Sequence, residues 1–327
     1  MTMHRTSRRP RIAITMGDPA GIGPEIAVKA LFSEEAAALC DLLVVGDADV
    51  LALAAEALGR PLQADRDARI LDLGRIARTE HAWGVATAAG GAAGAAYVER
   101  AVELALADDV AAIVTGPLNK EALNMAKVPF PGHTELLASL TGTTDYAMML
   151  VGPDLHVAHV STHVSLRTAI DRVQQPRIET VIGLTDAALR GEGIATPRIA
   201  VAGLNPHAGE GGLFGREEIE QIEPAVRATR ARGIDTTGPH PPDTVFLFAS
   251  RGHYDAVIAM YHDQGHIPAK LAGFDASVNV TIGLPIVRAS VDHGTAYDIA
   301  GTGRANESSL IEAIRYAARA AAARAAA

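Results

Sequence analysis

The chain has 327 residues, of which 48% are hydrophobic, so it can form one large or two medium domains with packed cores. A formal net charge of −9 with no basic stripe argues against a nucleic-acid partner, and no apolar run approaches the roughly 18 residues of a membrane span. The single cysteine, Cys40, excludes an internal disulfide and indicates a reducing compartment.

The first residues, Met1 to Arg11, are basic, but no apolar core follows them, so they are not a secretion signal. We expect this segment to be a disordered extension. A cytoplasmic location follows as the expectation for the whole protein.

Short β-branched runs alternate with longer Ala-, Leu- and Glu-rich stretches along the chain. The expected strands are Ile12 to Thr15, Leu42 to Val45, Ala111 to Thr115, Ala147 to Val151, Val157 to Val160, Ile199 to Val201, Ala256 to Ala259 and Val278 to Thr281. The expected helices are Ala86 to Ala107, Ile178 to Leu189, Arg216 to Arg230 and Ser308 to Arg324. Strands separated by helices predict an α/β fold with a mostly parallel sheet flanked by helices.

The first expected strand leads into a Gly-rich turn, Gly17 to Glu25, which opens a helix at Pro24. Glycines let the backbone approach a ligand, and a helix N-terminus favours an anion. The spacing is not G-x-G-x-x-G, so the Rossmann fingerprint is absent. The alternative is a tight turn without a ligand.

Two later segments repeat this arrangement. Thr115 to Lys120 follows another strand, and Pro131 to Glu135 opens a helix at which His133 and Thr134 would present donors to a phosphate or carboxylate. The alternative for Thr134 is a helix cap that needs no ligand.

Three histidines each follow an apolar run, two of them within Gly-rich loops. They are His163, His207 and His262. Strand ends of an α/β sheet line its ligand crevice, and neutral imidazoles are common ligands of divalent metals. Three of them with an open position predict a catalytic metal site, while the alternative is that each histidine caps its own loop.

Lys270 and Arg288 lie on otherwise apolar segments near Asn279. Buried charge must be paired or meet a ligand, and the arginine fork matches a phosphate. These residues therefore favour an anionic ligand, with surface placement as the alternative.

Several long motifs resemble those of the 4-hydroxythreonine-4-phosphate dehydrogenase family, over about Arg11 to Ala318. The carrying segments are GDPAGIGPE (Gly17 to Glu25), TGPLNK (Thr115 to Lys120), PGHTE (Pro131 to Glu135), THVSL (Thr162 to Leu166), GLNPHAGEGG (Gly203 to Gly212), PPDT (Pro241 to Thr244), AMYHDQGH (Ala259 to His266) and GLPIVRASVDHGTAYDIAGTG (Gly283 to Gly303). They occur in the order that the family has.

Two segments are also similar to the wider isocitrate and isopropylmalate dehydrogenase group. Its GDGIGPE turn appears here with Pro19 and Ala20 inserted, and its HGTAPDIAG loop appears with Tyr297 in place of proline. The resemblance implies a two-domain fold of that type, with the active site in the interdomain cleft. Residues 1–128 plus 272–327 would form the dinucleotide-binding domain, and residues 129–271 the central metal-binding and dimerisation domain.

The resemblance also implies roles for particular residues. The metal ligands would be His163, His207 and His262. The substrate contacts would be His133, Thr134, Lys270, Asn279 and Arg288. The NAD or NADP contacts would be Gly17, Asp18, His293, Gly294, Thr295, Asp298, Ala300 and Gly301. Asp263, Asp243 and Lys270 are the candidates for proton handling, and the two aspartates could instead orient a histidine or cap a loop.

The implied reaction oxidises the 3-hydroxyl of a 4-phosphorylated four-carbon acid with NAD(P), followed by decarboxylation, at an active site shared between the subunits of a homodimer. The substrate is 4-phosphooxy-L-threonine in pyridoxal phosphate biosynthesis, or 4-phospho-D-threonate or D-erythronate in sugar-acid catabolism. Zn²⁺, Co²⁺, Mn²⁺ and Mg²⁺ all stay open as the metal, as do NAD and NADP.

Two other classes of function are compatible with part of this pattern. A metal-dependent hydrolase would use the three histidines to activate water, but it has no use for the His293 to Gly301 loop. A non-catalytic sugar-phosphate sensor would need no metal, and it usually carries a DNA-binding module, which is absent from the sequence.

Overall fold

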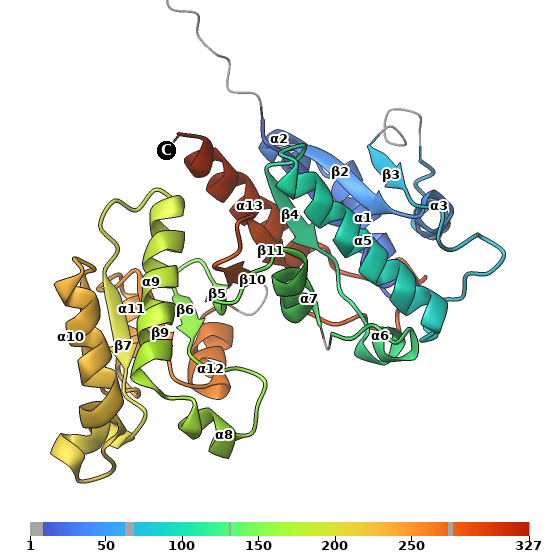
Figure 1. Cartoon of the computed structure of the whole chain (residues 1–327). Helices are drawn as coiled ribbons and strands as arrows, with labels where there is room; N and C mark the ends of the chain where they lie inside the picture. The colour runs from blue at the N-terminus through green and yellow to red at the C-terminus, as the bar shows by residue number, and fades with distance from the viewer. Residues whose placement is uncertain (1–8, 63–68, 131, 274–276, 327) are drawn as a thin grey trace, which may run out of the picture. The chain divides into compact units, whose positions relative to one another are not determined.

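The computed structural model describes residues 9–62, 69–130, 132–273 and 277–326, so most of the expected N-terminal extension lies outside it. The chain divides into two compact units, called unit 1 (1–143 and 284–327) and unit 2 (144–283) (Figure 1). The expected boundaries, after residues 128 and 271, lie earlier in the chain than the boundaries of these units. Helix α7 (His133–Leu140) packs on α5 (Ala88–Leu106) of unit 1, and strand β10 (Val278–Ile282) pairs with β5 (Ala147–Val151) of unit 2.

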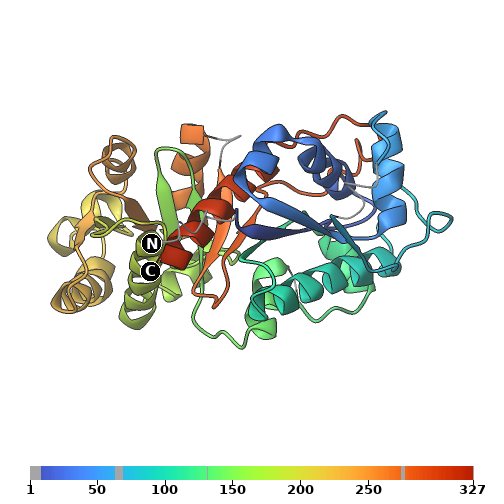
Figure 2. The same cartoon turned by 90° about the horizontal axis from the view of Figure 1, so that it is seen from above.

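Unit 1 is a parallel sheet with the strand order β3-β2-β1-β4-β11. Its strands are β1 (Arg11–Thr15), β2 (Asp41–Gly46), β3 (Ile70–Asp72), β4 (Ala112–Thr115) and β11 (Arg288–Ser290). Its other helices are α1 (Gly23–Phe32), α2 (Glu34–Leu39), α3 (Ala48–Ala57), α6 (Lys120–Met125) and α13 (Ser308–Ala326). Helices α5 and α13 pack on opposite faces of the sheet (Figure 2).

Unit 2 has the strand order β10-β5-β6-β9-β7-β8, antiparallel at β10-β5 and β5-β6 and parallel elsewhere. Its remaining strands are β6 (His156–His159), β7 (Ile199–Ala202), β8 (Thr236–His240) and β9 (Ala256–Ala259). Its helical segments are α8 (Leu166–Asp171), α9 (Gln175–Gly191), η1 (Pro206–Gly212), η2 (Glu218–Ile222), α10 (Glu223–Ala231), α11 (Val245–Ser250) and α12 (His262–Gly273). Both units bury apolar strand residues, and among the described residues no helix is long and apolar enough to cross a membrane.

Every strand expected from the sequence is present, to within one or two residues at its ends. The expected helix Arg216 to Arg230 is present, but its first part is a π-helical turn, η2, that precedes α10. Pro224 lies at the start of α10 and has no N–H for a regular helical bond, which accounts for the change of pattern. Strands β3, β8 and β11 were not expected from the sequence. Strands β3 and β11 have three residues each, and β8 contains Gly238 and Pro239.

Candidate functional site

Two of the three candidate metal-ligating histidines lie together in unit 2. His262 begins α12 directly after β9, and His163 follows β6. Their ring centroids are 5.4 Å apart, and both line a cavity of about 450 Å³. Because β6 and β9 are parallel neighbours, their carboxyl ends bring the two imidazoles to one edge of the sheet.

The orientation of His262 suits a metal ligand. Its Nδ1 lies 2.6 Å from Oδ1 of Asp263, which fixes Nδ1 as the protonated nitrogen. The lone pair then lies on Nε2, as in the carboxylate–histidine pairs of metal sites. Of the roles considered for Asp263, this contact supports that of orienting a histidine.

Two further histidines, His159 and His266, extend this cluster into the core, and no motif in the sequence pointed to the first of them. The ring of His266 stacks on that of His262 at 3.6 Å, and its Nδ1 lies 3.1 Å from Nε2 of His159. A Cβ on Gly265 would lie 2.4 Å from this nitrogen of His159, so only glycine leaves room for the pair.

The buried pair is neutral at ordinary pH. Burial, followed by the charges of neighbouring histidines, lowers the pKa of His159 to about 3, and the same two causes lower the pKa of His266 to about 4. Nδ1 of His159 donates a hydrogen bond to the carbonyl of Met148 at 3.3 Å. Nε2 of His159 is therefore the acceptor of the hydrogen bond from His266.

His207 lies in a left-handed turn, η1, which follows β7. Every residue from His207 to Gly212 has a positive φ, and among them His207, Ala208 and Glu210 carry a Cβ. A left-handed backbone costs such residues roughly 1–2 kcal/mol each. The surroundings must therefore hold the turn in this shape.

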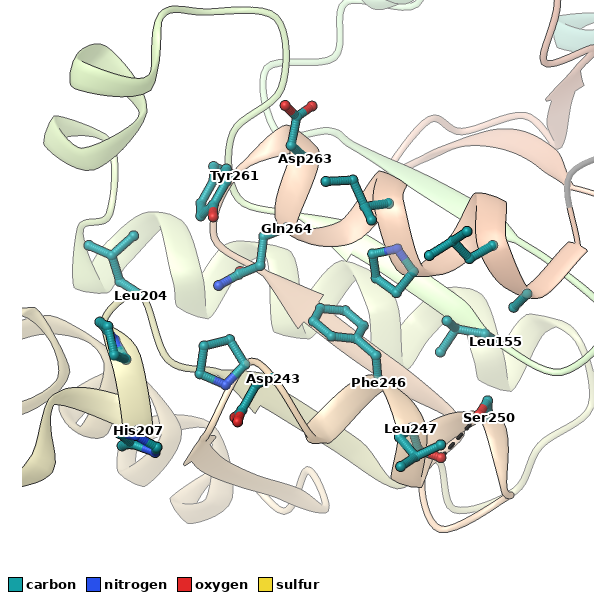
Figure 3. Close-up of a pocket in the computed structure, with 16 residues that line it drawn as sticks. Leu155, Leu204, His207, Asp243, Phe246, Leu247, Ser250, Tyr261, Asp263 and Gln264 are labelled. Carbon is teal, nitrogen blue, oxygen red and sulfur yellow. Dashed lines mark hydrogen bonds between the residues drawn. The ribbon is translucent and has the colours of Figure 1, made fainter.

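A cavity of about 880 Å³ brings His207 near the candidate acids of unit 2. It is lined by His207, Asp243, Tyr261, Asp263 and Gln264, together with apolar side chains (Figure 3). The side-chain amide of Gln264 accepts from the N–H of Met260 at 2.6 Å and donates to the carbonyl of Gly203 at 2.7 Å. Gln264 thereby ties the loop after β9 to the loop after β7.

The three histidines do not form one cluster within a single chain. Among the residues that the structure describes, no three His, Cys, Asp or Glu side chains lie close enough together to hold a metal ion. The donor set still suits a divalent metal, because His163 and His262 are adjacent and Asp263 leaves Nε2 of His262 as the donor.

The five expected substrate contacts divide between the units. In unit 2, Lys270 lies on α12 one turn after His266, and Asn279 lies on β10, where its Oδ1 is buried and has no hydrogen-bond partner among the described residues. In unit 1, His133 and Thr134 begin α7, whose N-cap is Gly132. Thr134 is therefore not the helix cap, and the alternative offered for it is wrong.

A candidate anion site lies around Arg288 in unit 1. Arg288 is 3% exposed and donates from Nη2 to Oγ1 of Thr115 at 2.7 Å. Burial lowers its pKa to about 9. Burial and the charge of Arg288 lower the pKa of His133 well below its usual range. The Nε2 atom of His133 is buried and has no hydrogen-bond partner in the described part of the chain. These groups form a site that a phosphate or carboxylate would satisfy.

The two segments expected to bind a dinucleotide are brought together in unit 1. The hydroxyl of Tyr297 donates to Asp18 at 2.8 Å, and the carbonyl of Thr295 accepts from the N–H of Ile22 at 2.9 Å. Burial raises the pKa of Asp18, although the bond from Tyr297 opposes this rise.

Gly17 has a φ of +78°, and a Cβ there would lie 2.5 Å from the carbonyl oxygen of Pro117. A Cβ on Gly294 would meet nothing within 4 Å. The buried Nε2 of His293 finds no hydrogen-bond partner among the described residues. Open space beside an unsatisfied donor or acceptor suits a polar ligand such as a dinucleotide. Asp298 is exposed and Ala300 is buried in the same loop.

Comparison with known proteins identifies the family. The sequence pattern of the family described as "Pyridoxal phosphate biosynthetic protein PdxA" matches residues 38–317. The D-threonate 4-phosphate dehydrogenase of Cupriavidus necator is 51% identical over 94% of this chain and 96% of its own length. The 4-hydroxythreonine-4-phosphate dehydrogenase of Desulfosudis oleivorans is 49% identical over 94% of each chain.

A solved structure extends the likeness to the fold. The 4-hydroxythreonine-4-phosphate dehydrogenase of Klebsiella pneumoniae is 50% identical, with a TM-score of 0.86, over 95% of this chain and 99% of that one. The match to the family pattern covers well over half of the sequence, and the identities hold over nearly the full length. This chain therefore belongs to the PdxA family.

Proposed function

We propose that this protein is a metal-dependent NAD(P) dehydrogenase that oxidises the 3-hydroxyl of a 4-phosphorylated four-carbon hydroxy acid and releases CO₂ from the product. The observation that carries this proposal is the Arg288–Thr115–His133 anion site, which occurs in a chain that also has the paired His163 and His262. The family relatives are named as dehydrogenases, so the hydrolase alternative is not favoured.

The chain's own residues would act as follows. Arg288 and the start of α7 bind the phosphate, and Lys270 and Asn279 contact the rest of the substrate. His163, His207 and His262 hold the metal, while Asp263 keeps the tautomer of His262 fixed. When bound, a divalent cation supplies charge stabilisation at the 3-hydroxyl oxygen, and NAD(P) supplies a hydride acceptor for C3. The resulting 3-keto acid loses CO₂ because its ketone accepts the electron pair.

Asp243 lines the same cavity as His207 and Asp263, and we propose it as the residue that handles the proton of the 3-hydroxyl. The loop His293 to Gly301, with Gly17 and Asp18, would bind the dinucleotide. The open space at Gly294 and the unsatisfied Nε2 of His293 support this assignment.

We favour 4-phospho-D-threonate as the substrate. In this scheme the 3-hydroxyl and the neighbouring group on C2 both lie at the metal. Lys270 is close to this position, since its charge helps to lower the pKa of His266. A C2 hydroxyl is neutral there, whereas the ammonium form of 4-phosphooxy-L-threonine would be repelled by Lys270. The Cupriavidus necator relative agrees with the first compound, and the Desulfosudis oleivorans relative keeps the second as an alternative.

We further propose a homodimer in which a second copy completes the metal site. Unit 2 exposes a group of large apolar side chains: Leu166, Ile170, Leu213, Phe214, Leu247, Phe248, Ile267 and Leu271. Several of them border the two cavities that contain the histidines. A second copy on this face would cover the apolar surface and supply the missing third ligand. A cytoplasmic location agrees with the need for NAD(P).

The test is NADH or NADPH formation with each of the two substrates, in the presence and absence of a chelator, by the wild type and by His207→Ala. We expect chelator-sensitive turnover that is faster with 4-phospho-D-threonate, and we expect His207→Ala to lose at least about 100-fold in kcat/KM while staying dimeric. Turnover that survives both the chelator and the substitution would contradict the metal assignment. No turnover of either substrate by the metal-loaded wild type would contradict the dehydrogenase proposal.

A further inference from the structure

A buried carboxylate lies directly behind the left-handed turn that carries His207. Glu218 is 2% exposed and begins the π-helical turn η2. Its Oε1 accepts from the backbone N–H groups of Leu204 and Asn205, both at 2.8 Å. Its Oε2 accepts from Nδ2 of Asn205 at 2.9 Å. Glu218 thus holds the segment immediately before His207 through three hydrogen bonds.

The glycines around the turn are shaped to this carboxylate. A Cβ on Gly209 would lie 2.7 Å from Oε2 of Glu218, and one on Gly203 would lie 3.2 Å from Oε1. Gly209 also has a φ of +81°, which strains any residue with a side chain. The turn and the carboxylate therefore fit each other on both sides of His207.

A carboxylate suits this position better than an amide of the same shape. All three donors converge on acceptor-only oxygens, while an amide in place of Glu218 would direct its NH₂ at one of them. Asn205 cannot correct this by turning its own amide, because its Nδ2 also donates to Oε2 of Glu217 at 2.7 Å. Ala208 also donates its N–H to the carbonyl of Asn205 at 3.1 Å, so the residue that Glu218 holds is itself bonded to the left-handed turn.

We infer that Glu218 is the positioning residue of His207: by holding Leu204 and Asn205 it fixes the left-handed turn in the one shape that presents this imidazole to the metal. The inference rests on the proposed function, in which His207 is a metal ligand. Glu218 touches neither metal nor substrate in this scheme and acts only through the turn. The placement of Glu218 on a π-helical turn agrees with a functional role, since such turns often occur at functional sites.

The chain offers a matched control one residue away. Glu217 is half-buried and accepts from the same amide of Asn205, but it bonds no backbone N–H of the segment before His207. We therefore compare Glu218→Gln with Glu217→Gln in the full-length protein. Gly209→Ala tests the same fit from the side of the turn, in case Glu218→Gln folds poorly.

Two measurements separate positioning from general stability. Hydrogen exchange reports the protection of the Leu204 and Asn205 amides in metal-free protein, and competition with a chromophoric chelator reports the affinity for Mn²⁺ or Zn²⁺. We expect Glu218→Gln and Gly209→Ala to speed exchange in residues 203–212 and to weaken metal binding by about 10- to 100-fold. Glu217→Gln should change the affinity by less than about threefold, and exchange in the sheet strands should stay unchanged in all three variants.

The outcomes distinguish this inference from the proposed function. If the wild type binds metal, His207→Ala does not, and Glu218→Gln binds as the wild type does, the inference is overturned and the proposed function stands. If His207→Ala keeps full metal affinity, the ligand assignment is wrong and both are overturned. Equal losses in Glu217→Gln and Glu218→Gln would also overturn the specific role of Glu218.

Discussion

Arg288 is a cation that the fold removes from water. It is 3% exposed, and burial lowers its pKa to about 9, which means that the charged form is less stable here than in solvent. Natural cores rarely keep such a group without a use for its charge. The proposed anionic ligand, bound beside the neutral His133, would offset the desolvation of the guanidinium.

The low pKa of His159 predicts how the free energy of unfolding depends on pH. The pKa of His159 is about 3 in the folded protein and 6.5 in the unfolded chain. Between these two pH values, the unfolded chain therefore binds a proton at this residue that the folded protein does not bind. The free energy of unfolding should therefore fall as the pH drops from about 6.5 toward 3, by about 1.4 kcal/mol per pH unit from this residue. Urea unfolding between pH 7 and 4.5 measures the slope.

His159→Gln is the control for this prediction. The glutamine does not titrate, but it keeps a donor and an acceptor. From about pH 6.5 to 4.5, the free energy of unfolding of this variant should therefore fall by about 3 kcal/mol less than that of the wild type. His133 and His266, whose pKa values are also lowered, should leave part of the slope in place. Identical slopes in the two proteins would contradict the burial of a neutral His159.

At the scale of elements, the Gly/Ala-rich start of helix α5 shows how small residues determine the packing of helices. A Cβ on Gly91 would lie 2.0 Å from the carbonyl oxygen of Ala122 in the neighbouring α6. This contact is with backbone, so a side chain cannot simply turn aside. The close approach of α5 to α6 therefore depends on glycine at this position.

We expect Gly91→Ala to lower the free energy of unfolding by about 1–3 kcal/mol, because the added methyl group forces the two helices apart. Gly183→Ala in α9 is the matched control, since a Cβ there meets nothing within 4 Å. It should instead stabilise the protein by about 0.5–1 kcal/mol through helix propensity. Thermal and urea unfolding of both variants provide the measurement, and a neutral Gly91→Ala would contradict the packing described.

At the scale of the whole molecule, the exposed apolar side chains of unit 2 predict association. Leu271 is 83% exposed and borders the cavity that contains His207. A charge at this position would be buried without a partner in a dimer. We expect Leu271→Asp to raise the dimer dissociation constant by about 100-fold or more, equivalent to about 3 kcal/mol, and to weaken metal binding with it.

Val85→Asp serves as the comparison, because Val85 is an apolar residue of unit 1 that is 50% exposed. Sedimentation velocity over a range of protein concentrations separates the two variants. A dimer that is equally tight in both would place the interface elsewhere, and a monomeric wild type would contradict the shared site.

The sequence by itself determined the α/β class, most of the strands and the family, because these depend on local hydrophobic patterns and on motifs that are continuous in the chain. It also predicted that Arg288 and His133 contact an anion. It could not find the His159–His266 pair or the contact of Glu218 with the turn before His207, which join residues far apart in the sequence.

Only the tertiary structure decided these contacts and the boundaries of the two units. Residues 133–140 resemble any short helix, and their place in unit 1 depends on packing against α5. The pairing of His163 with His262 follows from the parallel neighbours β6 and β9, while His207 follows β7 on a left-handed turn. A local pattern sets which element forms, whereas side-chain partners across the sheet depend on strand order, and strand order is a property of the whole fold.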